Sequence, residues 1–157
     1  VIAACGNAPT PNGRLDVNVG VAPNAEMGRF FGSLLAADLI TGMDGTNVLN
    51  FGNALPSASV GGGYTVGYTG AGAAPTGFTA ANMRAGHYLV LNGQAAAVAA
   101  GTGAVTPSQA SKIDRKLDDG VPTTGTVHGQ TGACQTGNLY DEDNANLTCA
   151  IAIRIQG

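Results

Sequence analysis

The sequence predicts a single α+β domain, because amphipathic helices and short strands are separated by long glycine-rich loops. The chain has 157 residues, including 25 glycines; 44% of its residues are hydrophobic and 11% are charged. This length suits one domain with one core, spanning residues 1–157 with a loop-rich segment at 1–23. Glycine has no triplet period, which excludes a collagen-like chain, and the ordinary apolar fraction excludes a fully disordered one.

Charge and hydropathy exclude several classes of partner. The net charge is −3, and the seven basic residues are scattered along the chain. A nucleic-acid binder concentrates positive charge, so we expect no nucleic-acid partner. No segment reaches the ~18 apolar residues that span a bilayer. The first five residues lack the features of a secretory signal, and the chain opens on Val1, so we expect that an upstream segment has been removed.

The first expected element is a helix after Asn24, which can serve as its N-cap, with Glu26 in the first turn. Gly42 supplies a left-handed stop. Apolar residues recur at helical spacing between these points, and they are Met27, Phe30, Phe31, Leu34, Leu35 and Leu39. This stripe predicts a face packed in the core; a partner-binding face is the alternative.

Two short strands are expected in the middle of the chain. Residues 64–68 alternate between large and small side chains, and residues 87–92 form a second β-like run. Residues 61–63 are three glycines, which we interpret as a flexible turn. A phosphate-binding loop would instead need a following helix and usually a lysine.

A second helix is marked by a capping box. Thr106 is the expected N-cap, Pro107 takes the first helical position and Gln109 lies three residues after the cap. Gly120 is expected to end the helix. A narrow apolar edge is formed by Ala110, Ile113 and Leu117.

The tail contains the clearest strand and two of the three cysteines. Residues 147–156 alternate, with Leu147, Cys149, Ile151, Ile153 and Ile155 on one face. Cys134 and Cys149 bracket one loop, and closing it would contribute about 3 kcal/mol in the chain-entropy model. We therefore expect a 134–149 disulfide with Cys5 free, in an exported protein. Two reduced, buried thiols in a cytosolic domain are the alternative.

Catalytic patterns are poor. His87 and His128 stand in no metal-ligand spacing, and no serine lies in a Gly-x-Ser-x-Gly pattern. Asp118 and Asp119 are expected to cap the second helix and form the turn before Gly120. We expect no enzyme and no required cofactor.

A calcium site is the one metal hypothesis. Residues 141–146 carry oxygen side chains at close spacing, and calcium takes six to eight oxygen ligands. The candidate ligands are Asp141, Asp143, Asn144 and Asn146. The segment lacks the glycine and the distal glutamate of a full calcium loop, so a solvated acidic turn is the alternative.

Three stretches resemble the globular head of type IV pilins and type II secretion pseudopilins. Residues 26–42 resemble the family's segment of an acidic residue, aromatics and leucines that ends Ala-x-Leu-Ile-x-Gly. The cysteines at 134 and 149 resemble the pair that bounds the family's C-terminal loop. Residues 111–127 resemble the most specific signature, carried by Ile113, Asp114, Lys116, Asp118, Asp119, Gly120, Pro122 and Gly125.

The resemblance implies a pilin-like head, in which an antiparallel sheet packs with one or two short helices. It implies a structural subunit of an extracellular type IV pilus-like or pseudopilus filament that acts by assembly. A minor pilin-like module that binds a ligand or secreted substrate through its loops is the alternative. The family's calcium-binding C-terminal loop also favours the calcium hypothesis.

The resemblance further implies an apolar N-terminal helix that this sequence does not contain. That helix would drive self-association with other subunits and would be the protein's only membrane contact. The subunit would be anchored in the inner membrane before assembly on the bacterial cell surface.

Overall fold

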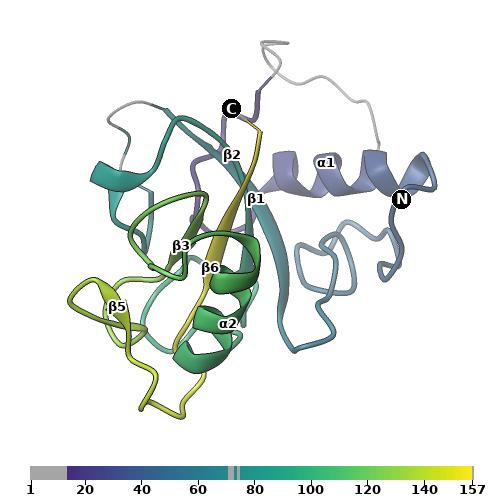
Figure 1. The fold of residues 1–157 in the computed structure, drawn as a ribbon. Coiled ribbons are helices and arrows are strands. Elements are labelled where there is room, and N and C mark those ends of the chain that lie inside the picture. Colours follow the sequence, from purple (N-terminus) through teal and green to yellow (C-terminus); the bar gives the residue numbers. More distant parts are fainter. Residues whose placement is uncertain (1–13, 71–72, 74, 157) are drawn as a thin grey trace.

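The computed structural model describes residues 14–70, 73 and 75–156, which form an α+β fold (Figure 1). Its elements in chain order are α1 (Ala25–Ala36), β1 (Gly63–Thr69), the 3-10 helix η1 (Ala80–Asn82), β2 (Gly86–Asn92), α2 (Pro107–Leu117), β3 (Val127–Gly129), β4 (Gln135–Thr136), β5 (Leu139–Tyr140) and β6 (Ile151–Gln156). The predicted α+β class is confirmed. No helix in the described ranges combines the length and the apolar character needed to cross a membrane.

One four-stranded antiparallel sheet organises the domain, with strand order β1-β2-β6-β3. Strands β4 and β5 form a separate hairpin. Val66 pairs with Leu89, Leu89 with Ile153, and Ile153 with Val127. Directly opposed residues of antiparallel strands share a face, so these four lie on one side of the sheet, which we call the helix face.

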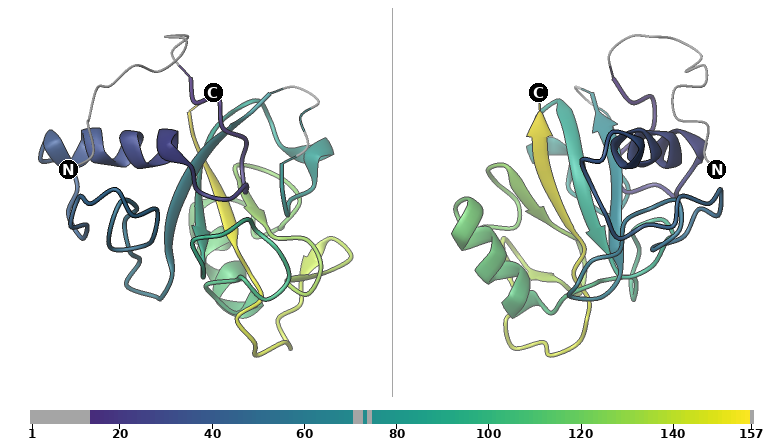
Figure 2. Two further views of the ribbon diagram at one scale, coloured as in Figure 1. Left: turned by 180° about the vertical axis from the view of Figure 1, so that it is seen from behind. Right: turned by 90° about the vertical axis from the view of Figure 1, so that its right-hand side faces the viewer.

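Both α-helices pack on the helix face, at opposite ends of the strand order (Figure 2). Met27 and Phe31 of α1 join a cluster with Val66 of β1. Ala110 of α2 joins a second cluster with Val127 of β3. The other face of the sheet is covered by loop residues in a third cluster, which contains Val19, Phe78, Met83, Tyr88, Val90, Val98, Ala150 and Ala152.

Apolar side chains remain partly exposed on the helix face. Leu89 packs at the margin of the α1 cluster, and Ile153 packs at the margin of the α2 cluster; neither is fully buried. Ile155 comes two residues after Ile153 on β6, where the β2–β6 register shifts, and 52% of its surface is exposed. We call Leu89, Ile153 and Ile155 the apolar strip.

Helix α1 begins as predicted and ends early. The Asn24 side chain accepts hydrogen bonds from the backbone N–H groups of Glu26 and Met27. The predicted stop at Gly42 is wrong, because Asp38 adopts the left-handed conformation at φ 56°. The Asp38 and Leu39 N–H groups then bond back to the carbonyls of residues 35 and 34, which is a Schellman pattern. Leu39 is consequently 70% exposed and lies outside the core.

Helix α2 carries the predicted capping box. The Thr106 hydroxyl accepts from Gln109 N–H, and the Gln109 side chain accepts from Thr106 N–H. Ala110 is buried and Ile113 is partly buried. Leu117 was expected on the same apolar edge, but it is 56% exposed at the end of the helix.

The final strand is shorter than predicted, and only its first residues are buried on both faces. β6 begins at Ile151, while Cys149 forms an isolated bridge with Val105 and Leu147 is 57% exposed. The alternation predicted an apolar face that carries Ile151 and Ile153, and the structure buries part of the opposite face as well. Ala150 and Ala152 are fully buried because loop residues cover the second face of the sheet.

Candidate functional site

The Cys134–Cys149 disulfide ties the tail loop to the sheet. The two Cα atoms are 4.9 Å apart, and both cysteines are buried in the α2 cluster. The predicted pairing is confirmed. Cys5, predicted to be free, lies outside the described residues.

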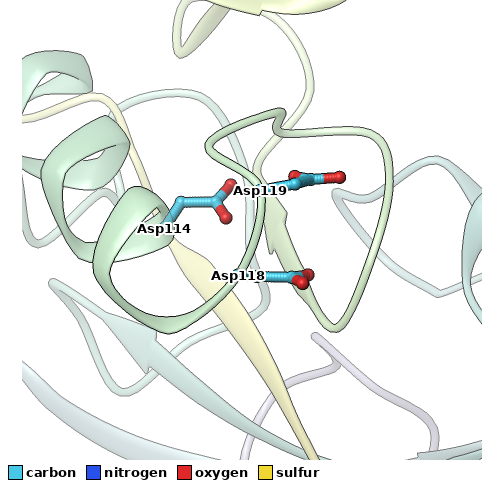
Figure 3. Close-up of side chains that lie close together, drawn as sticks. All are labelled: Asp114, Asp118 and Asp119. Atoms are coloured by element: carbon cyan, nitrogen blue, oxygen red, sulfur yellow. The ribbon is translucent and has the colours of Figure 1, made fainter.

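Three aspartates of the signature converge at the end of α2 (Figure 3). Asp114 lies in the last turns of the helix, Asp118 is its C-cap and Asp119 follows. One carboxylate oxygen from each residue lies within 4.8 Å of the others. We call residues 118–126, which these carboxylates hold, the carboxylate turn.

Asp114 is fully buried and links α2 to two other segments. Its Oδ1 accepts a hydrogen bond from Gly120 N–H at 3.1 Å. Its Oδ2 accepts from the Tyr140 hydroxyl on β5 at 2.8 Å. One side chain therefore connects the helix, the carboxylate turn and the β4–β5 hairpin.

The two exposed aspartates, Asp118 and Asp119, accept hydrogen bonds from other residues of the carboxylate turn and from the start of β3. Asp118 Oδ2 accepts from the N–H groups of Thr126 and Val127. Asp119 Oδ1 accepts from Val121 N–H at 2.8 Å, and its Oδ2 accepts from the Thr124 hydroxyl. These bonds join the end of α2 directly to the start of β3.

Glycine is required at one point of the turn. Gly125 has φ +77°, and a Cβ added there would overlap Asp118 Oδ2. A larger residue would strain the backbone and displace the carboxylate. The spacing between Asp118 and Gly125 in the signature therefore has a geometric reason. The Asp118 carboxylate passes over Gly125 to reach the Thr126 N–H.

Burial and hydrogen bonding shift the pKa values of these groups in opposite directions. Burial raises the pKa of Asp114, although hydrogen bonds from Tyr140 and Gly120 oppose the shift. The backbone hydrogen bond from Thr126 lowers the pKa of Asp118. Burial and the neighbouring Asp114 raise the pKa of the Tyr140 hydroxyl. The cluster is thus supplied with protein donors on all three carboxylates, an arrangement suited to fixing a turn.

Among the candidate calcium ligands, hydrogen bonds connect Asn144 to Asn146 and to the backbone of residue 133. Asn144 Oδ1 accepts from both the backbone N–H and the side-chain amide of Asn146, and Asn144 Nδ2 donates to Ala133 O. In the ranges that the structure describes, the aspartates of the signature are the one group of three or more His, Cys, Asp or Glu ligand atoms close enough to share an ion. Asp141 and Asp143 belong to no such group, and calcium binding there stays a prediction.

A pocket of about 430 Å³ lies beside this region. Glu142 lines it and accepts hydrogen bonds from Ser111 Oγ and the Arg115 guanidinium. These contacts lower the pKa of Glu142. The other lining residues are Gly120, Thr136, Leu139, Tyr140, Asp141 and Asp143.

Tyr140 and Glu142 were not singled out from the sequence, although each contacts a residue of α2. Both contacts join positions more than 25 residues apart, and no local pattern marks them. His128, the second histidine, is buried in β3, the strand that follows the carboxylate turn. Its Nε2 has no hydrogen-bond partner among the described residues, and its ring centroid lies 6.2 Å from that of Tyr88.

No protein-family model, curated protein or solved structure matches this chain.

Proposed function

We propose that this chain is the head domain of a structural subunit of an extracellular type IV pilus-like or pseudopilus filament. The subunit acts by assembly and performs no chemical reaction. The observation that carries the proposal is the apolar strip, where the sheet exposes Leu89, Ile153 and Ile155 in part. The signature residues and the tail disulfide supply the resemblance to the pilin and pseudopilin heads.

The apolar strip suits an apolar helix as its occupant. Strands β2 and β6 are paired over this region, so Leu89 and Ile153 are direct neighbours. Burial of partly exposed apolar surface contributes roughly 25 cal/mol per Å². A helix lying across the strip would cover these side chains and extend the two existing clusters. The resemblance supplies such a helix, N-terminal to the head in the full-length subunit.

The carboxylate turn and the disulfide support a repeating structural role. Asp114, Asp118 and Asp119 fix the turn between α2 and β3. The disulfide fixes the long connection between β3 and β6. A filament subunit must present the same surface in every copy, and these two devices hold its loops in one arrangement.

The test is a substitution in the full-length protein in cells that make the filament. Ile155→Asp places a charge on the apolar strip and should abolish filaments in sheared surface fractions examined by electron microscopy. Leu147→Asp is the matched control, because Leu147 is 57% exposed and lies before β6. Equal melting temperatures of the two isolated heads exclude a folding defect. Normal filaments from the Ile155→Asp cells would contradict the proposal.

A further inference from the structure

His87 accepts a hydrogen bond that only its neutral form can accept. His87 lies near the start of β2 and pairs with Tyr68 of β1. The two rings meet edge to face, with centroids 5.2 Å apart. Leu15 N–H donates to His87 Nε2 at 3.2 Å. This bond uses the Nε2 lone pair, so the ring must be neutral, with its proton on Nδ1.

The partner of His87 belongs to a segment that crosses the edge of the sheet. We call residues 14–17 the N-terminal strap. Tyr68 N–H donates to Val17 O at 2.8 Å, and Asp16 N–H donates to Glu26 Oε1 at 3.0 Å. Val17 is buried in the α1 cluster. The strap is therefore anchored in the core at Val17, and Leu15 is partly buried against the same cluster.

Among the described residues, the charged and titratable groups near His87 come from the strap, β1 and β6, and Glu26 of α1 bonds to the strap. Arg14 of the strap lies 5.2 Å from the Tyr68 ring centroid, and its Nε is 3.6 Å from Asp16 Oδ1. Tyr68 of β1 contacts the His87 ring itself. Arg154 of β6 pairs with Tyr88 and so lies on the opposite face of the sheet. A second positive charge at His87 would stand near Arg14, with Asp16 as the neighbouring anion.

We propose that His87 is a proton-sensitive latch that holds the N-terminal strap against the sheet. Protonation turns Nε2 from an acceptor into a donor and sets it against the Leu15 N–H. The bond is then lost, and the backbone of residues 14–16 moves away from the His87 ring, against the packing of Leu15 on the α1 cluster, while Val17 stays anchored. Histidine is the side chain whose charge ordinarily changes between pH 5 and 8. This inference rests on the strap contacts alone and does not depend on the proposed function.

The direct test is an NMR titration of the ¹⁵N-labelled chain from pH 8 to pH 5. The Leu15 amide resonance should follow the same titration curve as the His87 ring. In His87→Gln, the side-chain oxygen can accept the bond at every pH, so the Leu15 resonance should stay constant. In His87→Phe, it should take the released position at every pH. A Leu15 resonance that ignores the His87 titration, or that titrates equally in His87→Gln, would overturn the proposal.

Proteolysis gives a second readout at one pH. Trypsin cleaves after Arg14, inside the strap, and needs that segment to leave the sheet. Loss of one hydrogen bond should raise cleavage after Arg14 about fivefold in His87→Phe at pH 8. Cleavage after Lys116, which is exposed at the end of α2, is the internal reference. An unchanged ratio of the two rates would also overturn the latch.

Discussion

The Tyr140 hydroxyl donates a hydrogen bond to the buried Asp114 carboxylate at 2.8 Å, across 26 residues of sequence. This contact joins α2 to the β4–β5 hairpin, which lies within the disulfide loop. Asp114 also receives the Gly120 N–H and so connects the hairpin to the carboxylate turn. The signature and the tail loop therefore form one structural unit.

Removing the Tyr140 hydroxyl should weaken this unit. Tyr140→Phe leaves a buried Asp114 oxygen without its donor, so the free energy of unfolding should fall by about 1–3 kcal/mol. The measurement is denaturant unfolding with an unchanged m-value. Tyr64→Phe is the matched control, because Tyr64 is partly buried and its hydroxyl has no hydrogen bond to the described residues. Equal losses in the two variants would argue against the role of the Asp114 contact.

Gly125 should tolerate substitution less well than a second glycine of the same conformation. Gly125→Ala adds both backbone strain and an overlap with Asp118, whereas Gly137 has φ +64° and open space around its Cα. Strain alone costs about 1–2 kcal/mol, and overlap adds about 1–3 kcal/mol. Thermal unfolding of both alanine variants measures the difference. Similar melting temperatures for the two variants would show that the Asp118 side chain can move aside without loss of stability.

The buried His128 should make stability depend on pH. Burial lowers the pKa of His128 from its ordinary value of 6.5, so below that value the unfolded chain binds more protons than the folded chain. The stability present above pH 6.5 is therefore lost as the pH falls toward the folded-state pKa, by at most about 1.4 kcal/mol per pH unit. His128→Gln should flatten this slope between pH 7 and 5, measured by urea unfolding. If the pH dependence of the free energy of unfolding persists in His128→Gln, other titratable groups cause it.

Calcium binding at residues 141–146 predicts a stability change of its own. At 100-fold excess over Kd, calcium would add about 2.7 kcal/mol, which raises the melting temperature by several degrees. The measurement compares wild type and Asp143→Ala at about 1 mM calcium, an extracellular level, against chelator. Asp119→Ala is the control for the signature aspartates, whose oxygens already accept protein hydrogen bonds. No shift in the wild type would leave the segment as a solvated acidic turn.

Local features of the fold could be predicted from the sequence because their causes are local. Asn24 and Thr106 cap their helices through N–H groups two or three residues away. Strand β1 follows from alternation within its own residues, and β2 follows from a β-like run of residues. The disulfide followed from two cysteines that bracket one loop. The end of α1 was missed because a left-handed aspartate at Asp38 replaces the expected glycine.

Long-range features could not be predicted. The burial of Ala150 and Ala152 depends on loops that fold over the second sheet face. Tyr140 reaches Asp114, and Leu15 reaches His87, across 26 and 72 residues. The sequence marked the signature aspartates by resemblance, but their partners on the turn and hairpin appear only in three dimensions.

The composition of surface filaments tests the structural-subunit proposal most directly. Filaments would be sheared from cells that encode the full-length protein, purified, and quantified by mass spectrometry. The proposal predicts that this chain is a major component, present in many copies along each filament. A rare copy confined to the tip would instead fit a binding module, and absence of the chain from the filaments would contradict the assembly role.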